Sequence, residues 1–223
     1  MDCNLPDSPI ETVDLAARQQ QQQQSEKLTD QLNYWQQQLK TAPLILDLPT
    51  DHSRPSALSL VTAQCPFVLS QLLSAALKTL SRQEGVSFFT TLLTAWQLLL
   101  YRYSGQDDLL VGTPRMQHTS TGNEWVNWLV LRTRIIGNPP FRDMLGQVAQ
   151  VVVEAQANQD VPFEQVVQAL QPEPEPSRHP LFQVLFVLEQ APLQVQEGDG
   201  FTPRPVPQDS ETARCDLSLW LQE

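Results

Sequence analysis

The feature of this sequence that most constrains its fold is a helix-length stretch, residues 88–103, that is apolar nearly all round. Its apolar residues are Phe88, Phe89, Leu92, Leu93, Trp96, Leu99, Leu100 and Tyr103. A helix with apolar groups on most of its surface must be buried on several sides. Ser87 can cap its first turn, and residues 104–107 predict a turn after it. We therefore expect this helix to lie at the centre of a sizeable core.

Apolar residues at helical spacing predict four further helices around this one. They cover residues 10–40, the stretch that Ser70 can cap and Gly85 can end, the stretch opened by Pro139-Pro140, and the stretch that begins at Pro162. The residues that we expect on their apolar faces are Leu28, Leu32, Trp35, Leu39, Leu72, Leu73, Ala76, Leu77, Leu80, Phe141, Leu145, Val148, Val152, Phe163, Val166, Val167 and Leu170.

Five runs of mainly apolar residues predict strands between the helices. They span residues 58–68, 109–112, 125–136, 181–189 and 213–221. The run 125–136 carries Trp, Val, Leu and Ile throughout, which is typical of a strand covered on both faces. Because helices and strands are mixed along the chain, we expect an α/β (mixed α+β) fold, with a mixed sheet and packed helices.

Composition and charge exclude several classes of function. The 223 residues carry a formal net charge of −11. Nucleic-acid binding needs a basic surface, so we expect no nucleic-acid partner. No run of about 18 apolar residues is free of charge, and the N-terminus does not resemble a signal peptide. We therefore expect a cytoplasmic protein with no membrane partner. Cys3, Cys65 and Cys215 have neither disulfide nor metal spacing and are interpreted as reduced thiols.

The residues alone do not reveal an active site. The three histidines, His52, His118 and His179, are far apart in the sequence, and none lies in an obvious base–nucleophile arrangement. The sequence also shows no glycine-rich phosphate loop and no metal-ligand cluster, so we expect no metal site. This reasoning leads only to a soluble α/β domain without a visible catalytic centre.

Four motifs carry a further signal. Residues 101–114 read YRYSGQDDLLVGTP, residues 125–132 read WVNWLVLR, residues 158–164 read NQDVPFE and residues 177–184 read SRHPLFQV. In this order they make the chain resemble the condensation domains of nonribosomal peptide synthetases. Residues 158–164 read NQDVPFE and match the family's (H/N)QD(Y/V)PFE motif at every position. Residues 177–184, SRHPLFQV, resemble its SRNPLFQV motif with His for Asn. Residues 101–114 are similar to its RYSGQxDxxVGTP segment, and residues 125–132 to its FVNTLVLR strand. The resemblance covers residues 10–223 in the family's order.

The resemblance implies a fold, a reaction and partners. Condensation domains consist of two halves that are each similar to chloramphenicol acetyltransferase, with a tunnel between them. Peptidyl and aminoacyl carrier proteins deliver thioesters on phosphopantetheine arms, and an amide bond forms. An HHxxxDG motif at the end of the N-terminal half supplies the catalytic histidine. The resemblance implies no cofactor bound directly to this chain, only the phosphopantetheine arms of its partner carriers.

This chain corresponds to part of such a domain. We expect a disordered tail at residues 1–9, a helical connection and proline-rich linker at 10–56, and the C-terminal half of the domain at 57–223, truncated at its end. The HHxxxDG motif is absent from the sequence. The loop at 115–124 is shorter than in the family, and Thr12 and Arg18 replace aromatic residues of its first motif.

The resemblance also proposes site residues, none of them catalytic. The candidates for the tunnel or substrate side are Asn127, Arg132, Gln159 and Asp160. The residues interpreted mainly as structural are Pro162, Phe163, Glu164, Ser177, Pro180 and Phe182. Asp160 is positioned to cap the helix that begins near Pro162, and Glu164 is favoured in its first turn by the helix dipole.

Four functional hypotheses remain open at this point. The chain is an inactive fragment of a condensation domain, or a working half that pairs with a separately encoded N-terminal half. Alternatively, it is a non-catalytic module that docks carrier proteins, or an acyltransferase that uses a residue of its own such as His179. The missing motif and the lost aromatics favour the first hypothesis, whereas the intact late motifs favour retained folding.

Overall fold

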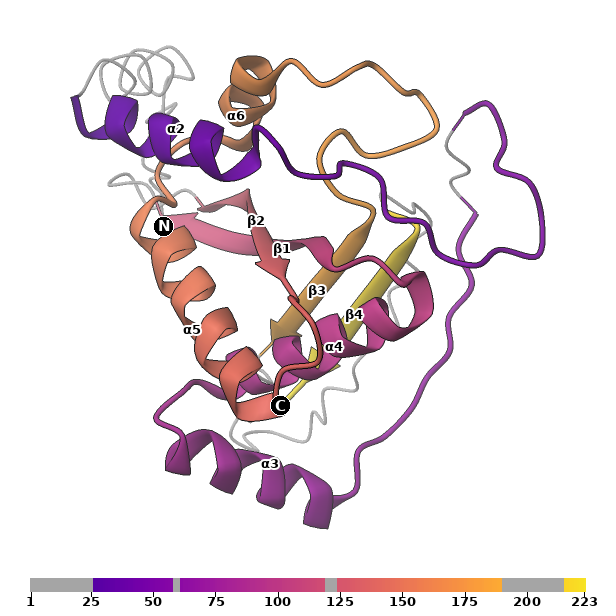
Figure 1. Cartoon of the computed structure of the whole chain (residues 1–223), viewed down its shortest axis with the longest axis vertical. Helices are drawn as coiled ribbons and strands as arrows, with labels where there is room; N and C mark the ends of the chain where they lie inside the picture. Colours follow the sequence, from indigo (N-terminus) through magenta and orange to yellow (C-terminus); the bar gives the residue numbers. More distant parts are fainter. Residues whose placement is uncertain (1–25, 58–60, 119–123, 190–214) are drawn as a thin grey trace, which may run out of the picture.

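The computed structural model describes residues 26–57, 61–118, 124–189 and 215–223 (Figure 1). The expectations for the tail, for the first part of the 10–40 helix and for most of the shortened loop therefore lie outside the described residues. The described chain forms the helices α2 (Glu26–Leu39), α3 (Gln71–Gln83), α4 (Phe88–Ser104), α5 (Phe141–Ala157) and α6 (Phe163–Leu170). Its strands are β1 (Asp108–His118), β2 (Glu124–Arg134), β3 (Val184–Glu189) and β4 (Leu217–Gln222).

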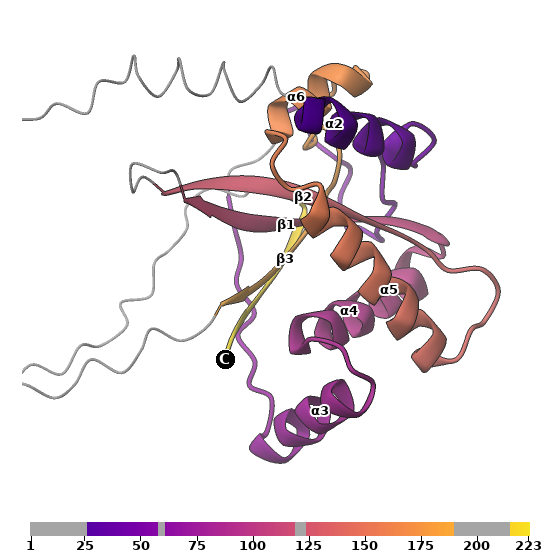
Figure 2. The same cartoon turned by 90° about the vertical axis from the view of Figure 1, so that its left-hand side faces the viewer.

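The four strands form one mixed sheet in the order β2-β1-β3-β4. β1 and β2 are antiparallel over their full lengths, whereas β3 lies parallel to both β1 and β4. Helices α2 and α6 lie together at the top of Figures 1 and 2, α5 packs on β2 and on α4, and α3 lies at the bottom of both views and contacts α4. The predicted α/β class with a mixed sheet and packed helices is confirmed.

Helix α4 takes the central position that its composition predicts. It contacts α3, α5 and β1, and Leu93 and Leu100 are fully buried. Ser87 caps it by accepting a hydrogen bond from the Thr90 amide at 3.0 Å, and Gly105 ends it in the left-handed conformation. The prediction is wrong at two positions, because Leu99 and Tyr103 are exposed while polar groups such as Gln97 are buried in their place.

Two predictions fail in the segment that precedes α4. Residues 61–68 form no strand, although their composition predicts one. Ser70 does cap α3, but Leu72 is 84% exposed and Leu73 is also exposed, so much of the expected buried face is open to solvent. An apolar pattern predicts that a face is buried, but it does not identify the residues that pack on it. Both errors fall on the same side of the molecule.

Helices α5 and α6 are formed as the apolar spacing predicts. Leu145, Val148 and Val152 of α5 are buried, and the helix packs on β2. Phe163 and Val166 of α6 are buried, but the helix packs on α2 as well as on β2. The connection at residues 40–56 is not an independent linker, because its Leu46 joins the same hydrophobic core.

Candidate functional site

The side chain of Asn127 on β2 organises the turn between α5 and α6. Its Nδ2 donates to the carbonyls of Gln159 and Val161 at 2.9 and 2.8 Å. Its Oδ1 accepts from the amides of Trp128 and Phe163 at 3.0 and 2.9 Å. Both hydrogens and both lone pairs of the buried amide are therefore used. The N-cap residue of α6, Pro162, makes no side-chain cap hydrogen bond. Asn127 on β2 takes this role by accepting from the first amide of the helix, that of Phe163.

Replacing Asn127 by alanine is expected to lower the free energy of unfolding by about 2–3 kcal/mol. The substitution leaves buried carbonyl and amide groups of the turn without partners, and each such group costs about 1–3 kcal/mol. Urea denaturation monitored by tryptophan fluorescence measures the change. Asn138→Ala is the matched control, because Asn138 is exposed and accepts only one long bond from Arg102. Equal effects of the two substitutions would contradict this role of Asn127.

The next two residues of the turn hold it against neighbouring elements. The Gln159 side chain accepts a hydrogen bond from Nε of Arg115 on β1 at 2.8 Å. Asp160 pairs with Lys27 at 2.8 Å and accepts from Gln31 Nε2 at 3.0 Å, which attaches the turn to α2. The hydrogen bond from Lys27 holds the pKa of Asp160 below its usual value. The prediction that Asp160 caps α6 is wrong, because the N-cap residue is Pro162.

Arg132 lies farther along β2 and is not part of this turn. Its guanidinium forms two bonds with the Asp108 carboxylate, at 2.8 and 2.6 Å. The same group donates to the carbonyls of Gln38 and Thr41, where α2 ends. A cation is favoured at this end of a helix, since the carbonyl groups there carry partial negative charge. In the structure Arg132 thus joins α2 to the sheet.

An aromatic cluster separates α6 from β1. The imidazole of His179 packs on the rings of Phe163 and Phe182, with centroids 5.3 and 4.0 Å away. Phe182 is almost completely buried and also contacts Trp128. Its ring lies against Gly112, where an added Cβ would fall 2.2 Å from the ring. Residue 112 must therefore be glycine to leave room for this ring. The imidazole of His179 lies in an aromatic environment.

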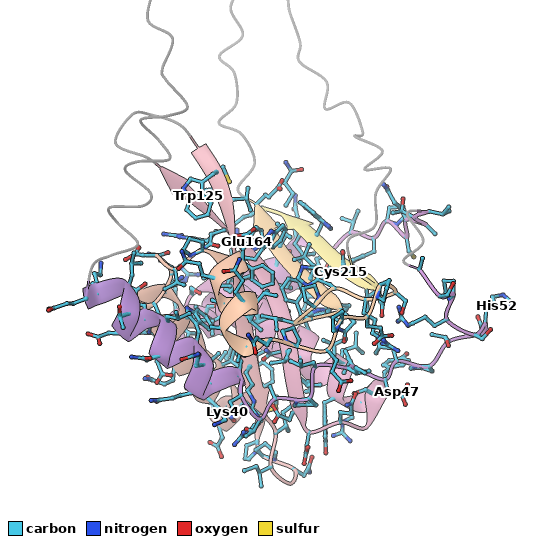
Figure 3. The ribbon with its side chains drawn as sticks, turned by 90° about the horizontal axis from the view of Figure 1, so that it is seen from above. Lys40, Asp47, His52, Trp125, Glu164 and Cys215 are labelled. Carbon is cyan, nitrogen blue, oxygen red and sulfur yellow. The ribbon has the colours of Figure 1, made fainter. Side chains whose placement is uncertain are left out.

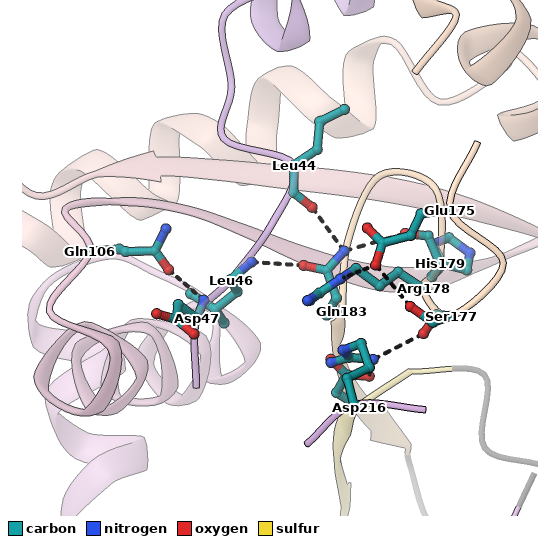
Figure 4. A network of polar contacts seen from close by, with 11 residues as sticks. Leu44, Leu46, Asp47, Gln106, Glu175, Ser177, Arg178, His179, Gln183 and Asp216 are labelled. Atoms are coloured by element: carbon teal, nitrogen blue, oxygen red, sulfur yellow. Dashed lines mark hydrogen bonds and ion pairs between the residues drawn. The ribbon is translucent and has the colours of Figure 1, made fainter. Parts of the chain in front are cut away.

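The segment that contains Ser177 and Pro180 is held by charged groups (Figure 4). Ser177 Oγ and Arg178 Nε each donate to the Glu175 carboxylate at 2.8 Å, and both bonds lower its pKa. Arg54 donates to the Ser177 carbonyl at 2.9 Å and pairs with Asp216. Ser177 is buried, while Pro180 and Glu164 are exposed.

Two glutamines anchor the proline-rich connection, and sequence reasoning did not identify either of them. Gln183 accepts from the Leu46 amide and donates to the Leu44 carbonyl, both at 2.8 Å. Gln106 accepts from the Asp47 amide at 2.7 Å and donates to the Ile45 carbonyl at 3.1 Å. Each carboxamide acts like a peptide group of a neighbouring strand, one on each side of the extended chain. Figure 4 shows both.

The other chemically capable groups that the structure describes lie apart. His52 is exposed on the connection, away from the body of the protein (Figure 3). Within the described ranges, no three His, Cys, Asp or Glu residues are grouped as metal ligands. A groove between α2 and α6 is lined by residues such as Gln36, Lys40 and Leu170, and by none of the candidate site residues. No helix in the part of the chain that is described is long and apolar enough to cross a membrane.

Comparison with known proteins identifies close similarity to one family. The family model for the condensation domain matches residues 3–223. Phosphinothricin tripeptide synthetase PhsC from Streptomyces viridochromogenes is 36% identical over all of the chain, which spans 21% of that relative. Malpinin synthetase from Mortierella alpina is 37% identical over 99% of the chain, and the match covers 3% of that protein.

Solved structures share the fold. A four-domain nonribosomal peptide synthetase, holo-AB3403 bound to AMP and glycine, superposes with a TM-score of 0.73 at 25% identity, over 82% of this chain and 14% of that one. The X-domain from teicoplanin biosynthesis gives a TM-score of 0.71 at 24% identity, over 80% of this chain and 41% of that one. The chain is thus shorter than the proteins that it matches.

Proposed function

The chain belongs to the condensation-domain family, and on that premise we propose that it is one half of a domain that forms an amide bond between carrier-bound substrates. The amine of an aminoacyl thioester attacks the carbonyl carbon of an acyl or peptidyl thioester. A C–N bond forms as the C–S bond breaks. The amine loses its proton to a general base, and the donor arm leaves as a thiol. Both phosphopantetheine arms belong to the carrier proteins.

The observation that carries this proposal is the network of hydrogen bonds that holds the NQDVPFE turn. Asn127 satisfies its whole amide there, Gln159 is bound by Arg115, and Asp160 is bound by Lys27 and Gln31. A decayed fragment has no reason to keep hydrogen-bond partners matched across three elements. We infer that this rigid turn and the adjacent end of the β1–β2 hairpin form the substrate side of the domain. Holding two tethered reactants in place makes their reaction nearly unimolecular.

The proposed half needs a base from elsewhere. The sequence has only three histidines and no HHxxxDG motif. His179 is packed against two phenylalanine rings, which suits a structural role. We therefore propose that a separate N-terminal half supplies the catalytic histidine and the other wall of the tunnel, and that the chain alone is inactive.

A complementation assay tests the proposal. The chain is mixed with the N-terminal half of the matching condensation domain of phosphinothricin tripeptide synthetase PhsC and with two loaded carrier proteins. We expect an amide product by mass spectrometry only when both halves are present. A control N-terminal half, with alanine for the second histidine of its HHxxxDG motif, should give none. Product formed by the chain alone would overturn the proposal, and its loss in His179→Ala would locate the site.

A non-catalytic module that docks carrier proteins is the alternative favoured by the missing histidine pair. The two functions give different results in the same mixture. A docking module would bind a carrier protein in size-exclusion chromatography and give no product with either N-terminal half. Absence of both binding and product would leave only an inactive fragment.

A further inference from the structure

We propose that Arg115, near the end of the β1–β2 hairpin, selects the substrate by binding a carboxylate on the side chain of the tethered amino acid, an aspartyl or glutamyl group. The inference rests on the proposed function, because it names the substrate class for the surface inferred there. Three observations carry it: the fixed orientation of the guanidinium group, the lack of a described carboxylate beside it, and the apolar side chains around it.

Gln159 fixes the orientation of the Arg115 side chain. Its Oε1 accepts a hydrogen bond from Arg115 Nε at 2.8 Å. The backbone of Gln159 is held in turn, because its carbonyl accepts from Asn127 Nδ2 at 2.9 Å. Arg115 lies directly opposite Asn127 in the register of β1 and β2, so both side chains are on the same face of the hairpin. The bond through Nε leaves the fork of the two terminal nitrogens, the geometry that holds a carboxylate with two parallel hydrogen bonds.

The exposed guanidinium of Arg115 pairs with no carboxylate among the side chains that the structure describes. The other two arginines of the hairpin share the Asp108 carboxylate. The acid of the adjacent turn, Asp160, is directed at α2, where Lys27 binds it at 2.8 Å. Because the chain carries a formal net charge of −11, most of its surface repels an anion. An oriented cation beside the substrate side therefore favours a carboxylate at this one place.

Apolar side chains surround Arg115 on the hairpin. Trp125 lies on the same face and diagonally across from Arg115, since it precedes Asn127 by two residues. On the other face, Met116 and Val126 are opposite one another and both exposed. Figures 2 and 3 show this end of the hairpin extending from the body of the protein, with Trp125 on it. The indole provides an apolar wall for the methylene groups of an acidic side chain, and by excluding water it strengthens the ion pair with Arg115.

The proposed reaction brings two kinds of anion to the protein, and the position of Arg115 favours one of them. One is a side-chain carboxylate of the amino acid, and the other is the phosphate of the carrier's arm. The phosphate is at the opposite end of the arm from the thioester, whereas Arg115 is bonded to the turn that we infer to lie on the substrate side. An asparaginyl group has the shape of an aspartyl group without its charge, so comparing the two measures the ion pair alone.

Binding to the whole chain tests the inference without any reaction. The probes are two pantetheine derivatives without phosphate, which carry an aspartyl or an asparaginyl group through a stable amide in place of the thioester. By isothermal titration calorimetry, we expect the aspartyl probe to bind about five- to tenfold more tightly, and less so at high salt. Arg115→Met should remove this preference and leave the affinity for the asparaginyl probe unchanged. Arg102→Met is the matched control and should retain the preference, because Arg102 is also exposed and contacts Asn138 rather than a carboxylate.

Equal affinity for the two probes, or a preference that survives in Arg115→Met, would overturn the inference. A purely structural role of Arg115 would weaken both probes by the same factor. Arg115-dependent binding of phosphopantetheine that carries no amino acid, with no preference between the two probes, would assign the residue to the arm instead. If Arg115→Met unfolds the chain, Arg115→Gln provides a second variant without the charge. The measurement contains neither carrier protein nor N-terminal half, so product formation without an aspartyl preference would leave the proposed function intact and remove only this inference.

Discussion

Replacing Phe182 by alanine is expected to lower the free energy of unfolding by about 3–5 kcal/mol, the range for a large aromatic residue removed from a core. The side chain is 1% exposed. Its ring contacts those of Phe163, His179 and Trp128. It also fills the space above Gly112, where no side chain exists to collapse into the cavity. The loss is therefore expected at the upper part of this range.

Chemical denaturation followed by circular dichroism measures the effect of Phe182→Ala. Phe67→Ala is the matched control, because Phe67 is 56% exposed in the stretch that precedes α3. The control should change the free energy of unfolding by about 0.5 kcal/mol or less, as surface substitutions usually do. Similar losses in the two variants would show that the aromatic cluster contributes little and that Gly112 is not constrained by the ring.

The elements that the sequence predicts correctly are those whose partners are built from the described chain itself. The apolar spacing of α4, α5 and α6 predicts helices because each finds a described neighbour. The same reasoning predicts the helix α3 correctly but not the exposure of its Leu72 and Leu73, and it fails for residues 61–68, which form no strand. The spacing of apolar residues predicts that a face is buried. Which element packs on that face depends on the tertiary structure.

In the candidate site too, the sequence points to the important residues but not to the groups that they contact. The motifs direct attention to Asn127 and Arg132, but apart from the neighbouring Trp128 amide their contacts lie between 24 and 94 positions away along the chain. Only the fold shows that Asn127 caps α6 and that Arg132 holds α2. Gln106 and Gln183 stand inside two of the quoted motifs, but nothing in the sequence singles them out, because a glutamine whose amide binds backbone cannot be told from one on the surface. Their role depends on an extended segment that passes within reach.

Substituting Arg132 with methionine is expected to cost about 3–5 kcal/mol, because it removes one partner of a buried ion pair and leaves the other. The Arg132 side chain is 6% exposed, and that of Asp108 is 19% exposed. Methionine retains much of the apolar stem, so the effect reports the charge and its hydrogen bonds. Besides Asp108, the carbonyls of Gln38 and Thr41 lose their donor. The end of α2 should therefore loosen first.

Arg134→Met provides the control, because Arg134 contacts the same Asp108 carboxylate at 3.3 Å from a side chain that is 53% exposed. An exposed ion pair contributes about 0–1 kcal/mol and weakens in salt. Urea denaturation at low and high salt compares the variants, and hydrogen exchange in α2 shows where each one loosens. We expect a large loss at both salt concentrations, with early exchange at residues 36–39, for Arg132→Met alone. Equal small losses would mean that Asp108 is satisfied by solvent and that α2 is held mainly by Trp35, whose indole donates to the Asn158 carbonyl at 2.8 Å.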